Sequence, residues 1–120
     1  MAAMAEMTRI CAGERLSKQA EFYIREHIAE KFSLEKIAGA LYINGNYLSR
    51  IFRKHTGTTL LAYHNRMRCE QARELLIHSD RSVSEIGEQV GFVSPAHFSH
   101  VFKKVEGCTP TEYRMTKSVQ

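Results

Sequence analysis

Apolar residues recur along this chain at intervals of three and four, the spacing of one face of an α-helix. One such stripe runs through residues 17–31, and a longer one runs through residues 59–78 without a helix breaker. The first consists of Ala20, Tyr23, Ile24, His27 and Ile28, and the second of Leu60, Tyr63, Met67, Ala72, Leu75 and Leu76. At about 1.5 Å per residue, the second helix is expected to be roughly 30 Å long.

Two other segments, residues 33–63 and 82–113, are copies of one unit. Identical or similar residues recur at an offset of 49 in the first part, as in Ile37 and Ile86. The offset is 50 after a short turn, as in Phe52 and Phe102. A repeat of this length is a supersecondary unit.

Each copy predicts a helix, a tight turn and a second helix. Serine, threonine and asparagine are favoured N-caps, and glycine supplies the left-handed residue that ends a helix. The N-cap candidates are Ser33, Asn44, Ser82, Ser94 and Thr109, and the glycine caps are Gly57 and Gly107. The second helix of each copy has one apolar face, with Leu48, Ile51, Phe52 and His55 in the first and Phe98, Val101, Phe102 and Val105 in the second.

These elements predict an all-α fold of seven helices, with two helix-turn-helix lobes (a homeodomain-like pair) joined by a long linker helix. The expected divisions are a flexible N-terminal segment at 1–15, a first lobe at 16–58, the linker at 59–78, a second lobe at 79–116 and a tail at 117–120. A lobe of roughly 50 residues is marginal alone, so the linker is expected to bury surface from both.

Composition is that of an ordinary globular protein. The 120 residues are 43% hydrophobic and 25% charged, with no apolar run long enough for a membrane span and no visible signal peptide. Three widely spaced cysteines, Cys11, Cys69 and Cys108, argue against a disulfide framework and favour a reducing cytoplasm.

Positive charge is concentrated in two zones. The net charge is +4, but residues 36–69 contain six Lys or Arg and no acidic residue. Residues 70–93 carry five acids and two bases, and the chain becomes basic again after Lys103. Two basic zones separated by an acidic one favour two contacts with one polyanion.

The second helix of each copy offers polar side chains opposite its apolar face. Arg can pair with guanine and Asn with adenine in the major groove, so these helices are candidates for reading DNA bases. The base-reading candidates are Asn46, Ser49, Arg50 and Arg53 in the first copy and Ala96, Ser99, His100 and Lys103 in the second. Candidates for phosphate contact are Lys54, Lys104, Arg66 and Arg114. The second face is smaller and less charged, so it is expected to read sequence more weakly and DNA shape more strongly.

These residues carry a resemblance to the DNA-binding domain of AraC/XylS-family transcription regulators, over about residues 16–115. The pattern comprises Leu34, Ile37 and Ala38, then Tyr47, Leu48, Ser49, Arg50, Phe52, Arg53, Lys54 and Gly57, with Tyr63, Arg68, Ala72, Leu75 and Leu76 in the linker. The second copy contributes Ile86, Gly87, Gly91, Phe92, Phe98, Ser99, Phe102, Lys103, Lys104, Gly107, Thr109, Pro110, Tyr113 and Arg114.

The resemblance implies a bacterial regulator that binds two adjacent major grooves of double-stranded DNA and activates transcription through RNA polymerase. The reading helices would be residues 45–55 and 95–105. Most members carry an effector or dimerisation domain, which is expected to be absent from this chain. Gly87 stands where the family usually has alanine, a change expected to loosen that helix by ~1 kcal/mol, and Pro95 and Ala96 replace longer polar residues.

Other functions fit the residues less well. A basic helical module that binds an acidic protein partner is the alternative hypothesis. RNA binding lacks an aromatic platform. His97 and His100 have no third metal ligand, and no nucleophile–base pair or phosphate-binding glycine loop is visible, so neither a metal, a cofactor nor an enzymatic activity is expected. No membrane contact is expected, and the location implied is the cytoplasm, in association with the nucleoid.

Overall fold

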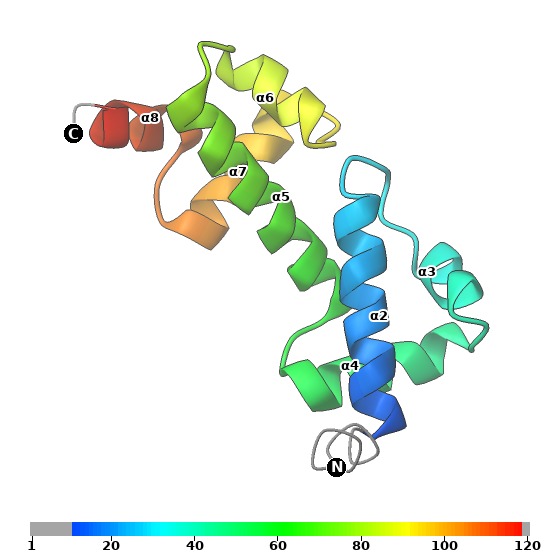
Figure 1. Ribbon diagram of the computed structural model, residues 1–120. Helices are drawn as coiled ribbons and strands as arrows, with labels where there is room; N and C mark the ends of the chain where they lie inside the picture. Colours follow the sequence, from blue (N-terminus) through cyan, green and yellow to red (C-terminus); the bar gives the residue numbers. More distant parts are fainter. Residues whose placement is uncertain (1–10, 119–120) are drawn as a thin grey trace, which may run out of the picture. The chain divides into compact units, whose positions relative to one another are not determined.

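The computed structural model describes residues 11–118, which form seven α-helices and no strand within that range (Figure 1). The helices are α2 (Ala12–Glu26), α3 (Leu34–Ala40), α4 (Gly45–Thr56), α5 (Leu60–His78), α6 (Val83–Gln89), α7 (Pro95–Glu106) and α8 (Pro110–Ser118). The all-α class with seven helices is therefore confirmed.

The contacts divide the chain into two compact units. Unit 1 comprises the residues up to His27 and Phe32–Tyr63, and unit 2 comprises Ile28–Lys31 and the chain from His64 onward. The first residues of α5 therefore belong to unit 1 and the rest of this helix to unit 2. Each unit contains one helix-turn-helix pair, α3 with α4 and α6 with α7.

The two cores repeat the same aromatic contact. In unit 1 the ring of Phe52 lies edge-on to Tyr63, with centroids 5.8 Å apart. In unit 2 the matching pair, Phe102 and Tyr113, has centroids 5.6 Å apart in the same geometry. Both phenylalanines are fully buried, so they belong to the cores, as their positions on the predicted apolar faces indicated.

Side-chain caps fix where most helices begin. Ser33, Asn44, Ser82 and Ser94 each accept hydrogen bonds from backbone N–H groups in the first turn of the helix that follows. Thr109 and Glu112 form a reciprocal capping box at α8, with bonds of 2.9 and 3.1 Å. These bonds lower the pKa of the Glu112 carboxyl. Gly57 and Gly107 end α4 and α7 in the left-handed conformation, as predicted.

The first helix differs from the prediction at both ends. It was expected at 17–31 but spans Ala12–Glu26. The Sγ of Cys11 accepts from the N–H of Glu14 and so caps α2, whereas Ser17 lies inside the helix and donates to the carbonyl of Gly13 at 2.8 Å. Part of the segment expected to be flexible, residues 12–15, is thus helical. The rest, residues 1–10, and the end of the expected tail, residues 119–120, lie outside the described range.

A buried arginine binds the segment that follows α2. Within unit 2, Arg68 donates from Nε to the carbonyl of Ile28 at 2.8 Å and from Nη2 to that of Glu30 at 2.6 Å. Its guanidinium also lies over the ring of Phe92, 5.3 Å from the centroid. Bound to these carbonyls, Arg68 holds Ile28–Lys31 in a non-helical path.

The Ile28–Lys31 segment runs so close to the α6–α7 turn that only glycine fits there. A Cβ on Gly91, which has φ +105°, would lie 2.6 Å from the carbonyl oxygen of Ala29. In the turn of unit 1 the matching position is Tyr42, which adopts φ +59° with its side chain almost wholly exposed. Among residues 11–118, no helix has both the length and the apolar character needed to cross a membrane.

Candidate nucleic-acid interface

Helix α4 separates an apolar face from a polar one. Leu48 and Phe52 are fully buried in unit 1. Asn46, Arg50 and Arg53 are exposed, and Ser49 is half-buried between the two faces. The structure therefore brings all four base-reading candidates of the first copy onto the accessible side of one helix. Such a side carries the donors and acceptors that can reach base edges in a major groove.

Tyr47 supports the arginine at the centre of this face. The guanidinium carbon of Arg50 lies 5.7 Å from the ring centroid of Tyr47, within the range of a cation–π contact. The tyrosine is 38% exposed. The ring of Tyr47 therefore packs against Arg50.

Helix α7 repeats the arrangement with smaller side chains. Phe98, Val101 and Phe102 are buried in unit 2. Opposite them, Ala96, His100 and Lys103 are exposed and Ser99 is half-buried. His97 lies edge-on to Phe92, with ring centroids 5.3 Å apart, and so packs beside the turn. The second face thus presents one full positive charge where the first presents two.

The four phosphate candidates fall into two groups. Lys54, Lys104 and Arg66 are exposed on α4, α7 and α5. Arg114 is half-buried, and its guanidinium donates to the carbonyls of Leu76 at 2.9 Å and Ser79 at 3.3 Å. It therefore satisfies carbonyls at the C-terminal end of α5, a structural role that the sequence did not indicate.

Two residues assigned to the apolar faces are exposed, and a third, Ile51, is only half-buried. His55 is exposed, and Val105 is 39% exposed. Both lie in the last turn of their helices, beyond the last buried phenylalanine. The imidazole of His55 lies instead against the first turn of α2, near Cys11.

Sequence reasoning also missed a buried polar pair at the start of α5 in unit 2. His64 is 3% exposed and Arg68 is 5% exposed. Burial, together with the positive charge of Arg68, lowers the pKa of His64 from 6.5 to about 4, although a hydrogen bond with the backbone of Ile28 opposes this shift. Neither side chain is available to DNA. The sequence signals for the pair were the position of both residues on the apolar stripe of the linker helix and, for Arg68, its place in the family pattern.

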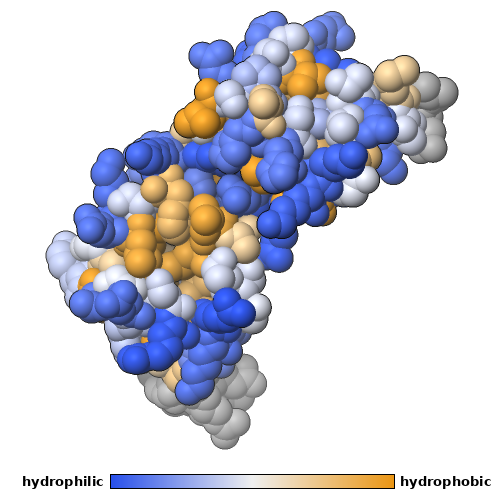
Figure 2. All heavy atoms as spheres, turned by 180° about the vertical axis from the view of Figure 1, so that it is seen from behind, coloured by the Kyte–Doolittle hydropathy of each residue, from blue (hydrophilic) through white to orange (hydrophobic). Residues whose placement is uncertain are grey.

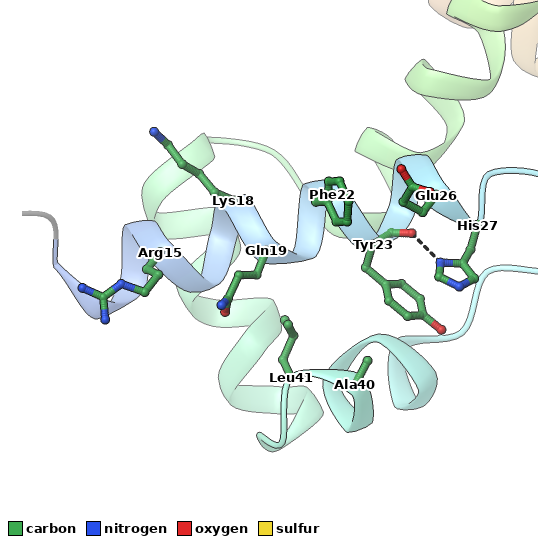
Figure 3. Close-up of a pocket in the computed structure, with 9 residues that line it drawn as sticks. All are labelled: Arg15, Lys18, Gln19, Phe22, Tyr23, Glu26, His27, Ala40 and Leu41. Carbon is green, nitrogen blue, oxygen red and sulfur yellow. Dashed lines mark hydrogen bonds between the residues drawn. The ribbon is translucent and has the colours of Figure 1, made fainter. Parts of the chain in front are cut away.

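Unit 1 also carries an apolar groove away from the reading residues. Its volume is about 480 Å³, and α2 supplies most of its wall, with Ala40 and Leu41 completing it (Figure 3). Phe22 is 61% exposed beside it, and Figure 2 shows apolar surface on this unit with polar side chains around it. Tyr23 and His27 stack in its wall, with ring centroids 4.0 Å apart. None of the eight base-reading candidates lines this groove.

Comparison with known proteins agrees with this geometry. A family model described as a helix-turn-helix domain matches residues 37–116. The activator RhaS of Escherichia fergusonii is 40% identical over 92 residues, which are 77% of this chain and 33% of RhaS. The chain spans about a third of the length of the curated relatives that it matches.

Solved structures of the same fold include domains of two regulatory proteins. The C-terminal domain of AraT, a response regulator from Geobacillus stearothermophilus, has a TM-score of 0.84 at 31% identity, covering 93% of this chain and 91% of that one. The DNA-binding domain of AdpA, in complex with a target DNA, has a TM-score of 0.80 at 31% identity, covering 86% and 93%. The match over both helix-turn-helix pairs, in sequence and in fold, places this chain in the AraC-type helix-turn-helix family.

Proposed function

We propose that this chain binds double-stranded DNA sequence-specifically, with α4 and α7 as its reading helices, and so regulates transcription. The observation that carries the proposal is the polar face of α4, where Asn46, Arg50 and Arg53 are exposed opposite a fully buried apolar face. The fold likeness to the DNA-bound AdpA domain supports the same assignment.

The two helices are expected to contribute unequally. On α4, two arginines and an asparagine can each form bidentate bonds with a base, each worth about 1–3 kcal/mol of discrimination. On α7, Ala96 can contact a thymine methyl group, while Ser99 and His100 can each make single hydrogen bonds. The helix α4 therefore supplies most of the base recognition, and α7 adds phosphate contacts and sensitivity to DNA shape.

A paired substitution tests the reading face of α4. Arg50→Ala with Arg53→Ala removes two charges and two base-reading groups, whereas Arg15→Ala with Lys18→Ala removes the same charge from the exposed surface of α2 in the same unit. Fluorescence anisotropy on a selected duplex and on a scrambled duplex, at several salt concentrations, separates the two effects. In the first variant, the ratio of the affinities for the selected and the scrambled duplex is expected to fall at least tenfold. The second should keep that preference.

The alternative function gives a different result. A module that binds an acidic protein would show weak, salt-sensitive affinity for every duplex and no difference between the selected and scrambled sequences. A preference that survives the double substitution in α4 would refute the assignment of the reading face.

Activation through RNA polymerase and association with the nucleoid are further parts of the proposal. The name of RhaS as a transcriptional activator supports the first. Transcription in vitro from a promoter that carries the selected sequence is expected to rise when the chain is added. A fall in transcript would make the chain a repressor at that promoter, and an unchanged level would remove activation from the proposal.

A further inference from the structure

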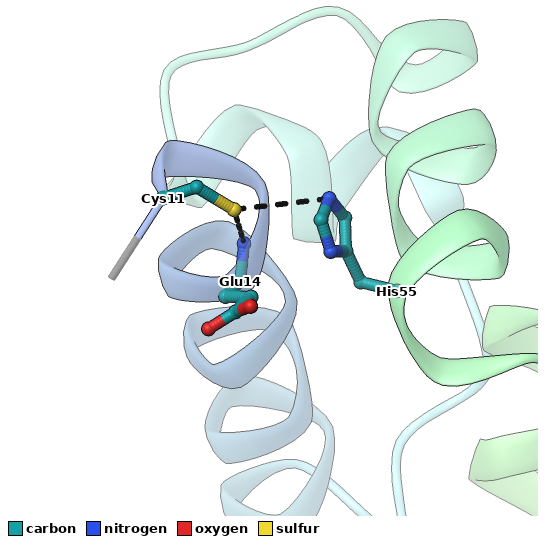
Figure 4. Close-up of side chains that lie close together, drawn as sticks. All are labelled: Cys11, Glu14 and His55. Carbon is teal, nitrogen blue, oxygen red and sulfur yellow. Dashed lines mark hydrogen bonds between the residues drawn. The ribbon is translucent and has the colours of Figure 1, made fainter. Parts of the chain in front are cut away.

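Three side chains with metal-binding atoms lie together in unit 1, at the contact of α2 with α4. They are Cys11, Glu14 and His55 (Figure 4). One ligand atom from each, a thiol sulfur, a carboxylate oxygen and an imidazole nitrogen, lies within 4.8 Å of the other two. The Sγ of Cys11 is 4.0 Å from the Nε2 of His55. All three side chains are exposed and so are accessible from solvent.

The first turn of α2 positions the three side chains of this cluster. Cys11 is the N-cap of α2, and its sulfur accepts from the N–H of Glu14 at 3.4 Å, so both ligands belong to one helical turn. Gly13 between them is buried, and a Cβ at that position would overlap the imidazole ring of His55. The missing side chain thus creates the space that lets the α4 histidine approach the first turn of α2.

The donor set selects a class of metal. Thiolate and imidazole together favour borderline and soft cations over Mg²⁺ and Ca²⁺, which prefer oxygen. A tetrahedral zinc centre with bonds of about 2.0–2.3 Å places its sulfur and nitrogen ligands about 3.6 Å apart. The observed 4.0 Å between Sγ and Nε2 is close to this value. Small side-chain rotations would bring the three atoms onto one ion, with water in the fourth position.

We propose that Cys11, Glu14 and His55 form a binding site for Zn²⁺. The ion would join the first turn of α2 to the last turn of α4 and so stabilise unit 1 against unfolding. His55 lies in the last turn of α4, two residues after the base-reading candidate Arg53 and at the opposite end of the helix from Asn46. The site shares no ligand with the base-reading candidates, and it does not depend on the proposed DNA binding.

Cobalt substitution tests this site directly. The full chain, reduced and metal-free, would be titrated with Co²⁺ and followed by absorption, because a thiolate ligand adds a charge-transfer band and tetrahedral geometry intensifies the d–d bands. One Co²⁺ per chain, displaced by Zn²⁺, is the expected result. Cys11→Ser and His55→Gln should each weaken binding at least tenfold and remove or shift these bands.

Two matched variants control for other ligands. Cys108→Ser removes a thiol outside the cluster, and His78→Gln removes an exposed helical histidine that lies 3.6 Å from Glu74. Both should bind Co²⁺ as the original chain does. Circular dichroism and the metal-free melting temperature check that each variant folds, and Zn²⁺ should raise the melting temperature only where the cluster is intact. A chain that shows no thiolate band, or variants in Cys11 and His55 that keep it, would overturn the proposal.

Discussion

Gly87 and Phe98 form a size-matched pair in the core of unit 2, and their coupling can be measured. A Cβ on Gly87 would lie 2.7, 2.9 and 3.1 Å from the Cδ2, Cγ and Cβ atoms of Phe98, which is itself fully buried. The matching positions of unit 1 hold Ala38 and Leu48, both buried. The expectation that Gly87 only loosens its helix is therefore incomplete, because the missing methyl group makes room for the larger ring.

The magnitude follows from two opposing effects in Gly87→Ala. Alanine gains ~1 kcal/mol of helix propensity over glycine. Overpacking in a filled core costs about 1–3 kcal/mol, and the contacts with Phe98 leave the new methyl group no free space. A net loss of roughly 1 kcal/mol in the free energy of unfolding is expected, or about 4–8 °C in melting temperature for a domain of this size.

A double-mutant cycle isolates the pair. Phe98→Leu alone leaves a cavity and is expected to cost about 1–2 kcal/mol. Combined with Gly87→Ala, it recreates the alanine–leucine pair of unit 1. The stability lost by the double variant should therefore be smaller than the sum of the two single losses by about 1–3 kcal/mol. Urea unfolding followed by circular dichroism supplies the four free energies.

The reciprocal exchange in unit 1 is the control. Ala38→Gly with Leu48→Phe should show coupling of the same sign, since it transfers the unit 2 pair into the matching position. Losses for Gly87→Ala and Phe98→Leu that add to within about 0.5 kcal/mol would refute the reasoning.

Three further predictions concern single residues. Folding lowers the pKa of His64 from 6.5 to about 4. As the pH falls from 6.5 to about 4, the unfolded chain therefore takes up the proton first, and the free energy of unfolding should decline by up to about 3 kcal/mol. His64→Gln should lose this part of the pH dependence in urea titrations at pH 7 and 4.5, and identical profiles would contradict the buried neutral histidine. Burial, with the nearby Glu106, raises the pKa of Cys69 to about 12, so a thiol reagent should modify Cys11 in the native chain and reach Cys69 only after denaturation. Tyr42 has φ +59° and an exposed side chain, so Tyr42→Asn should raise the melting temperature by a few degrees, equivalent to about 1 kcal/mol, and a lower melting temperature would show that the tyrosine makes a stabilising contact.

Features set by local chemistry were predictable from the sequence. The caps at Ser33, Asn44, Ser82 and Ser94 depend only on a side chain and the next turn of backbone. Because the two copies share one pattern, a cap or apolar position predicted in one copy could be checked against the matching position in the other. The buried faces of α4 and α7 followed from the same periodicity, as far as Phe52 and Phe102.

Features set by distant contacts were not predictable. The non-helical segment after α2 is bound by Arg68, which donates to the carbonyls of Ile28 and Glu30 from about 40 positions further along the chain. The roles of Arg114 at the end of α5 and of His55 beside Cys11 also depend on contacts between elements far apart in sequence. Periodicity assigns a residue to a face, but it does not show which backbone groups that face will meet.

The most direct test of the central claim is selection of duplex DNA from a random pool, at near-physiological salt, by the original chain and by the Arg50→Ala, Arg53→Ala variant. Reading by both helices predicts a bipartite motif with half-sites about 10 base pairs apart. The half read by α4 should be the more informative, and the variant should lose that half alone. Enrichment of one motif by both proteins, or of none by the original chain, would contradict the assignment of α4 as the principal reading helix.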